Sequence, residues 1–143
     1  MRHAAILLFT GLLLAASPTR QLSGAEADTG QAQSENKDQI VIGDNAGEKI
    51  ITGDGNDNIS GKGGDDFIES GNGNDLVSGG DGNDKIIGGD GDDYIIGGDG
   101  DYVVSDGAGS DYIVLGNGND TFVYYLDRNK GSHDFAVGGE GDD

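Results

Sequence analysis

Residues 79–96 read GGDGNDKIIGGDGDDYII, which is one nine-residue pattern written twice. In each copy, places one to six are rich in glycine, aspartate and asparagine, and places eight and nine hold isoleucine. Glycine accepts positive φ at little cost, and Asn and Asp tolerate it better than most residues. The first six places therefore predict a turn, and the last three predict a short strand of about three residues.

The same frame continues on both sides of this stretch, over residues 43–123. The first copy, GDNAGEKII at 43–51, is degenerate, and Lys62 stands where a glycine is expected. The eighth place is always apolar: Ile50, Ile59, Ile68, Val77, Ile86, Ile95, Val104, Ile113 and Phe122. One invariant apolar place per short strand predicts a side chain that points inward from a stack of coils. A helix is disfavoured, because each glycine would cost about 1 kcal/mol.

The repeat resembles G-G-x-G-x-D-x-U-x, the nonapeptide of the hemolysin-type calcium-binding (RTX) family, over residues 52–123. The resemblance implies an all-β fold, a parallel β-roll (a β-helix-like solenoid) of nine-residue repeats. In that fold two repeats make one coil, so that repeats alternate between two sheets and stacking partners lie eighteen residues apart. It also implies that several Ca²⁺ ions bind in the turns.

Oxygen donors suited to calcium recur at fixed places of the repeat. Calcium takes six to eight oxygens from carboxylates and backbone carbonyls. The carboxylates predicted to bind metal are those of Asp57, Asp66, Asp75, Asp84, Asp93, Asp111 and Asp120. Glycine turns expose carbonyls, and the candidate donors are Gly53, Gly55, Gly64, Gly71, Gly73, Gly80, Gly82, Gly89, Gly91, Gly98, Gly100, Gly107 and Gly109. Tyr102 replaces the sixth-place acid of one copy, which predicts weak or vacant ion sites beside it.

Composition narrows the classes of function. The chain has a formal net charge of −19, which argues against binding nucleic acid. It has no cysteine, which rules out disulfides and zinc-thiolate sites. An EF-hand is excluded, because Asp90-Gly91-Asp92 is followed by Ile95 where that loop needs glycine. The apolar core looks too thin to order the repeats alone, so metal binding is expected to supply folding free energy.

The chain divides into four segments. Residues 1–27 are predicted to be a signal peptide, with Arg2, an apolar run at 4–16 and a small-x-small cleavage candidate at 25–27. Residues 28–42 are read as a polar flexible leader, and residues 43–123 as the calcium-binding roll. Residues 124–143 are read as a capping segment with an unfinished repeat at 138–143. No stable membrane span is expected after signal cleavage, and the predicted location is extracellular.

These observations predict an exported calcium-binding protein that folds on binding calcium and is not an enzyme. Ser132-His133-Asp134 contains triad residue types, but adjacency in sequence is not triad geometry, and His133 is read as a surface or capping residue. Two alternatives stay open. One is an interaction or adhesin module that binds a surface polysaccharide or protein, and the other is the truncated C-terminal part of a secreted RTX enzyme or toxin.

Overall fold

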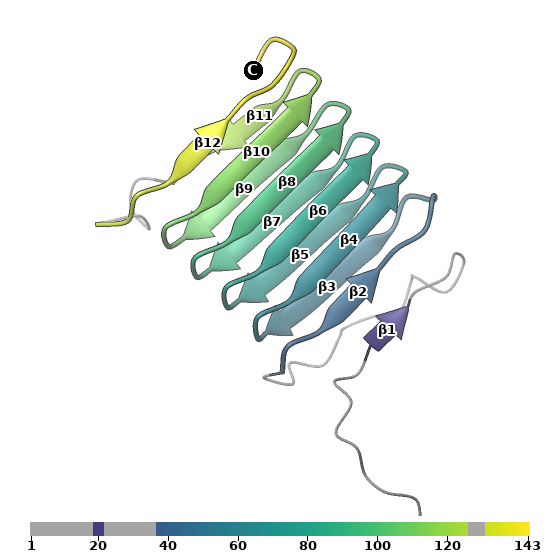
Figure 1. The fold of residues 1–143 in the computed structure, drawn as a ribbon, viewed down its shortest axis with the longest axis vertical. Helices are drawn as coiled ribbons and strands as arrows, with labels where there is room; N and C mark the ends of the chain where they lie inside the picture. The colour runs from purple at the N-terminus through teal and green to yellow at the C-terminus, as the bar shows by residue number, and fades with distance from the viewer. Residues whose placement is uncertain (1–18, 22–36, 126–130) are drawn as a thin grey trace, which may run out of the picture.

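The computed structural model describes residues 19–21, 37–125 and 131–143. Its strands lie in two layers joined by turns at both edges (Figure 1), and every pairing between them is parallel. One sheet has the order β1-β2-β4-β6-β8-β10-β12 and the other β11-β9-β7-β5-β3. Successive strands from β2 to β12 alternate between the sheets, so the chain winds as a solenoid. The predicted parallel β-roll is confirmed.

The strands follow the repeat. The seven-stranded sheet holds β1 (Thr19–Gln21), β2 (Ile40–Ile42), β4 (Asn58–Gly63), β6 (Leu76–Asp81), β8 (Tyr94–Asp99), β10 (Tyr112–Asn117) and β12 (Phe135–Val137). The five-stranded sheet holds β3 (Lys49–Asp54), β5 (Phe67–Asn72), β7 (Lys85–Asp90), β9 (Val103–Ala108) and β11 (Thr121–Val123). Ile95 lies opposite Ile113 and Ile86 opposite Val104, which are the eighteen-residue offsets that the repeat predicts.

Most strands are six residues long, which is twice the length that the pattern predicted. They begin at place seven and continue through the first three places of the next copy. Gly89 at place two has φ +122° and still pairs with Gly71 and Gly107 in the coils on either side. A Cβ on Gly89 would lie 1.8 Å from the carbonyl oxygen of Gly71. Glycine therefore serves here to let two backbones approach closely within a sheet, and not only to make a turn.

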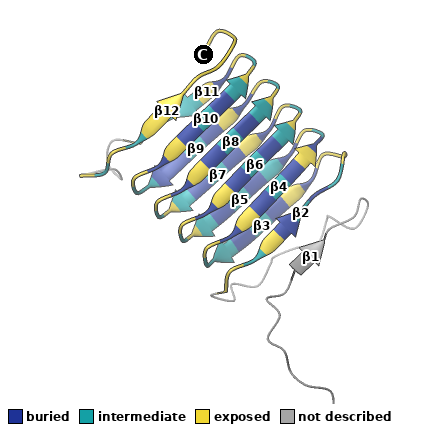
Figure 2. Ribbon diagram, viewed as in Figure 1, coloured by how far each residue is buried: buried dark blue, intermediate teal, exposed yellow. Residues whose placement is uncertain are grey.

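The core is mainly a row of eighth-place apolar side chains in each sheet, facing the other sheet, and Tyr102 and Leu115 also belong to it. The eighth-place residues from Ile50 to Ile113 are at most 2% exposed, and Phe122 is half-buried against them. Figure 2 shows buried positions alternating with exposed or half-buried ones along the strands, as expected for a strand with one face inside. The inward direction predicted for the eighth place is confirmed.

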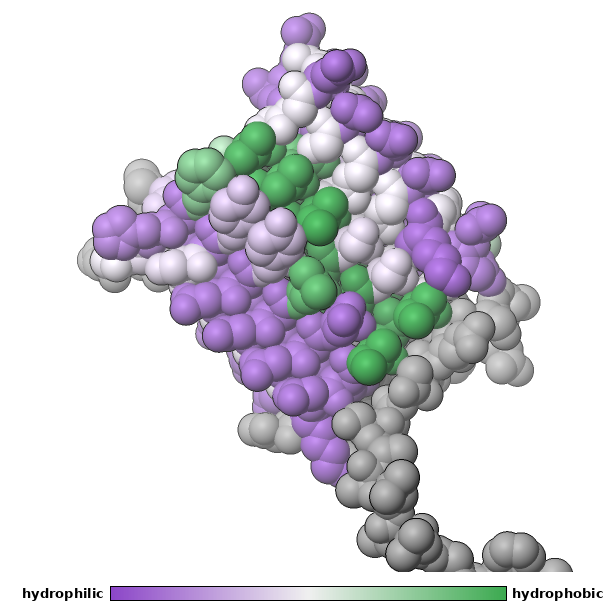
Figure 3. Space-filling view, viewed as in Figure 1, coloured by the Kyte–Doolittle hydropathy of each residue, from purple (hydrophilic) through white to green (hydrophobic). Residues whose placement is uncertain are grey.

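Aromatic side chains stack on the outer face of the seven-stranded sheet. The rings of Tyr94 and Tyr112 lie 5.0 Å apart, and those of Tyr112 and Phe135 lie 5.1 Å apart. Figure 3 shows hydrophobic side chains across the strands of this face and hydrophilic ones along the turns. On the other sheet, Phe67 is half-buried between the ammonium groups of Lys49 and Lys85. Phe67, Tyr94 and Tyr112 occupy the seventh place of their repeats and lie on the outer faces of the sheets.

Both ends of the roll extend beyond the predicted repeats. β2 lies within the expected leader and pairs with β4, so the stacked coils begin before residue 43. β12 lies within the expected capping segment and pairs with β10 at an offset of 23 residues, five more than between the strands of the repeats. Of the predicted signal peptide and leader, residues 1–18 and 22–36 lie outside the described part, and β1 pairs with β2. In the described ranges, no helix is long and apolar enough to span a bilayer.

Candidate metal centre

The sixth-place acids form two buried columns along the roll. Each acid ends a turn and directly precedes the first residue of a strand, so the backbone carries its side chain toward the interior. One column consists of Asp57, Asp75, Asp93 and Asp111, and the other of Glu48, Asp66, Asp84, Tyr102 and Asp120. All of these residues are at most 6% exposed. Every aspartate that the sequence singled out as a candidate ligand therefore lies in one of the columns.

A ladder of hydrogen bonds orients one oxygen of each carboxylate. The Oδ1 atom accepts a hydrogen bond from the backbone N–H of the same place in the preceding coil. Asp75 Oδ1 accepts from Asp57 at 2.8 Å, and Asp93 Oδ1 accepts from Asp75 at 2.9 Å. The bonds to Asp57, Asp66, Asp84, Asp111 and Asp120 follow the same eighteen-residue step. The ladder fixes the direction in which the second oxygen points.

The second oxygen of each carboxylate is buried without a hydrogen-bond partner. This holds for Oδ2 of Asp57, Asp66, Asp75, Asp84, Asp93, Asp111 and Asp120, and also for Glu48 Oε2 and Asp134 Oδ2. A buried carboxylate oxygen that lacks a partner is costly unless a cation or a proton neutralises it. The columns are therefore incomplete as a protein-only structure, and a hard cation fits the oxygens that they offer.

Glycines make room around these oxygens. A Cβ on Gly61 would lie 2.2 Å from Asp66 Oδ2, and a Cβ on Gly88 would lie 2.6 Å from Asp93 Oδ2. All the glycines predicted as carbonyl donors adopt positive φ. The carbonyl oxygen of Gly55 lies 2.0 Å from where a Cβ on Gly73 would be, so it faces the next coil. At Gly61 and Gly88 the Cβ position also lies close to a backbone carbonyl of the next coil, that of Gly79 and that of Asp106.

Burial raises the pKa values of most of the column carboxyl groups. Desolvation raises the pKa of Asp93 to about 8, and that of Asp84 and Asp111 to about 6. It raises the pKa of Glu48 to about 7, and it also raises the pKa values of Asp57, Asp66 and Asp75. Neighbouring carboxylates add to these shifts. A group with a raised pKa holds a proton readily when no cation is bound.

A pH dependence of metal-free stability follows from these shifts. The carboxyls bind protons more tightly in the roll than in the unfolded chain, whose values lie near 4. Between about pH 4 and pH 8 the folded state therefore binds more protons, and its stability falls as the pH rises. In excess chelator, the β signal in circular dichroism should be stronger at pH 4.5 than at pH 8. With saturating calcium the trend should reverse, because protons compete with the ion. A chelated chain that is more folded at pH 8 would contradict the assignment.

Tyr102 interrupts the second column with an aromatic ring. Its side chain is 1% exposed, and its hydroxyl donates a hydrogen bond to the carbonyl oxygen of Gly80, one of the candidate donors. Its ring atoms lie 3.0 Å and 3.1 Å from where Cβ atoms on Gly79 and Gly97 would be. The adjacent Asp101 is exposed, and its Oδ1 accepts a hydrogen bond from the N–H of Asn119 at 2.8 Å. The tyrosine thus fills the space of an ion site, and Asp101 does not replace the missing carboxylate.

The substitution Tyr102→Asp is expected to add one calcium ion to the fully loaded protein. It restores the sixth-place carboxylate and frees the Gly80 carbonyl. The sequence alone predicts easier folding as well, but the buried ring contributes to the core, and its loss costs about 3–5 kcal/mol in the absence of metal. The number of ions bound in native mass spectrometry is therefore the decisive measurement. Tyr102→Phe keeps the ring and should leave the number unchanged; an equal count for Tyr102→Asp would contradict the role given to this residue.

Asp134 is not among the ligands that the repeat pattern predicts. Asp134 Oδ1 accepts a hydrogen bond from the N–H of Asp111 at 3.0 Å, across 23 residues. The sequence does carry a signal for it: Asp134 directly precedes the apolar residues of β12, as a sixth-place acid precedes its strand. The extra five residues in the offset take Asp134 out of the nine-residue frame, so the pattern does not identify it. Asp143 Oδ1 continues the second column by accepting from Asp120 N–H at 3.2 Å. His133 is exposed, as expected for a surface residue.

Comparisons with known proteins agree with this geometry. A family model described as the RTX calcium-binding nonapeptide repeat (four copies) matches residues 42–77, 70–104 and 103–122. Together these matches cover more than half of the chain and include all the aspartates predicted as ligands. No curated protein and no solved structure matched the chain.

Proposed function

The chain belongs to the RTX calcium-binding nonapeptide-repeat family, and from this premise we propose that it is an exported, non-catalytic protein whose roll is completed by bound calcium. The observation that carries the proposal is the recurrence of one buried, unpartnered carboxylate oxygen at the sixth place of successive repeats. A single orphan oxygen would be a local defect. A column of them, in register with the repeat, indicates a common ligand.

The residues that would hold the ions are the sixth-place aspartates and the backbone carbonyls of the glycine turns. The free oxygens of Asp57, Asp66, Asp75, Asp84, Asp93, Asp111 and Asp120 supply negative charge. Calcium would neutralise these carboxylates and join neighbouring coils through shared oxygens. Magnesium suits the site less well, because it demands a tighter octahedral shell and keeps its waters.

Export and the absence of catalysis are further parts of the proposal, and each has its own support. Export is supported by the apolar run at residues 4–16 after Arg2. A role without catalysis is supported by the register of the unpartnered carboxylates: apart from Asp134, each occupies the sixth place of the repeat as the sequence counts it, and Asp134 continues one column. Such regularity suits a structural task that is repeated in every coil.

Isothermal titration calorimetry of the full chain tests the proposal. Several calcium ions should bind with dissociation constants of about 10⁻⁴–10⁻³ M, the range of extracellular modules, and magnesium should bind more weakly. Asp93→Asn should remove binding capacity or weaken it. Asp90→Asn makes the same charge change at an exposed place of the same repeat and should leave binding nearly unchanged. Absence of calcium binding, or equal effects of the two variants, would refute the proposal.

A further inference from the structure

The first place of one repeat departs from all the others. In the described repeats this place holds glycine, serine, threonine or leucine, but the copy at 106–114 begins with Asp106. Asp106 lies in β9 and is 0% exposed. The first place is the one whose Cβ would approach the free oxygen of the sixth-place acid, as the glycines at 61 and 88 show. An acid at this place therefore brings a second carboxylate toward Asp111.

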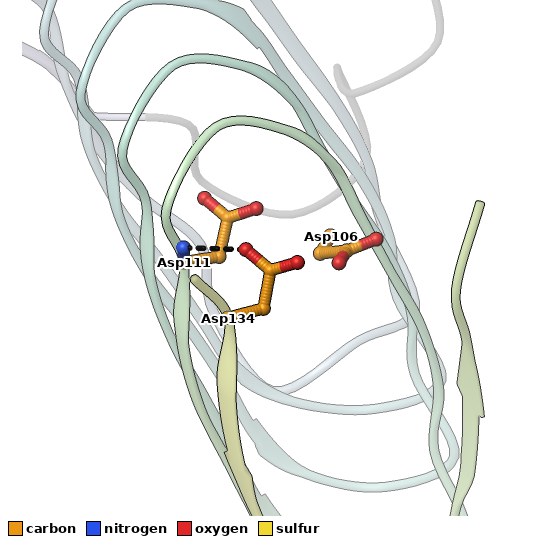
Figure 4. A group of neighbouring side chains, drawn as sticks. All are labelled: Asp106, Asp111 and Asp134. Atoms are coloured by element: carbon orange, nitrogen blue, oxygen red, sulfur yellow. Dashed lines mark hydrogen bonds between the residues drawn. The ribbon is translucent and has the colours of Figure 1, made fainter. Parts of the chain in front are cut away.

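Asp134, in the last coil, supplies a third carboxylate. Asp134, which precedes β12, reaches the same region because of the five-residue offset, and its Oδ1 accepts the hydrogen bond from Asp111 N–H. The carboxylates of Asp106, Asp111 and Asp134 each offer an oxygen, and these oxygens all lie within 4.8 Å of one another. Figure 4 shows the three side chains converging from three different segments of the chain.

Two carboxylate oxygens of this cluster, one on Asp111 and one on Asp134, have no hydrogen-bond partner. Asp111 is 2% exposed, and its Oδ2 is buried without a hydrogen-bond partner. Asp134 Oδ2 is buried and unpartnered in the same way. Asp106 Oδ1 accepts a hydrogen bond from the N–H of Gly107 at 2.7 Å, which holds its carboxylate in place. Three acids held this close, with two unpartnered oxygens, are costly unless a cation or a proton neutralises them, and calcium is the cation that the repeats are proposed to bind.

We propose that Asp106, Asp111 and Asp134 form a three-carboxylate calcium site at the C-terminal coil, in which the first-place Asp106 is added to the column acids and makes the site tighter than the other turn sites. The inference rests on the proposed function, since it takes calcium as the ligand. Elsewhere each repeat contributes one carboxylate to its column, whereas here the first place adds another. Because the number of charged ligands tunes the affinity of calcium sites, this site fills first as the calcium concentration rises.

Native mass spectrometry of the full chain, titrated with calcium, measures the affinity of the first ion. Asp106→Asn keeps the shape of the side chain but removes its charge, and Asp106→Gly restores the residue found at this place beside Asp93. Both variants should weaken the first ion by about tenfold or more, and Asp134→Asn should do the same from the other side of the site. Asp81→Asn removes one charge at an exposed third place and should change the affinity by less than about twofold.

The outcomes separate this inference from the proposed function. If the unmodified chain binds no calcium, the proposed function fails. If it binds calcium but both Asp106 variants and Asp134→Asn bind the first ion like Asp81→Asn, only the three-carboxylate site is refuted. Circular dichroism in saturating calcium checks that each variant keeps the roll. Should one Asp106 variant fail to fold, the other and Asp134→Asn still decide the question.

Discussion

In excess chelator at neutral pH, the chain is expected to give a coil-like circular dichroism spectrum, and millimolar calcium should convert it to a β spectrum. Stacked strands lie about 4.8 Å apart, so ionised carboxylates in adjacent coils of a column repel by about 3 kcal/mol per pair at an effective dielectric constant of about 20. Each buried eighth-place side chain returns only about 2 kcal/mol. Without metal the repulsion therefore cancels much of the stabilisation that the core provides, and with metal the sign of the interaction reverses.

Magnesium is the control for the folding of the chain by calcium. Magnesium at the same concentration should leave most of the chain coil-like, because it loses its hydration shell reluctantly. Sodium chloride at equal ionic strength separates screening from specific binding. A β spectrum in chelator at neutral pH would show that the roll folds without a cation, and the role given to the orphan oxygens would then be wrong.

The second large effect is expected from a charge placed in the core. Ile86 is 0% exposed at the eighth place, facing the opposite sheet. Ile86→Asp would bury an unpaired carboxylate and remove a close-packed side chain, which is a combination that costs more than about 4 kcal/mol. Urea unfolding at saturating calcium should show the roll abolished or strongly destabilised, with a large rise in the calcium concentration needed for folding.

Ile87 offers the matched control, one residue along the same strand. Its side chain is half-buried on the outer face of the sheet. Ile87→Asp makes the same chemical change and should destabilise the roll far less, because water can still reach the carboxylate. Ile86→Val should cost only about 0.5–1.5 kcal/mol, since it removes a single methylene. Equal losses at 86 and 87 would contradict the inward direction of the eighth place.

The nine-residue period was sufficient to predict much of the molecule. A constant repeat produces the same turn and strand each time, so the register of one pair of coils extends to all of them. The eighth-place core, the eighteen-residue stacking and the columns of Asp57 to Asp111 and Asp66 to Asp120 follow from this regularity. Even the interruption at Tyr102 was visible as a break in the pattern.

Features that break the nine-residue period could be found only in the tertiary structure. The extension of strands through the glycines depends on the backbone of the next coil, and the place of Asp134 depends on how a five-residue insertion is accommodated. The hydroxyl of Tyr102 on the Gly80 carbonyl and the approach of Asp106 to Asp111 are contacts between different places of the repeat. A linear pattern specifies which residues recur, whereas distances between non-equivalent places are set by the packing of one coil on the next.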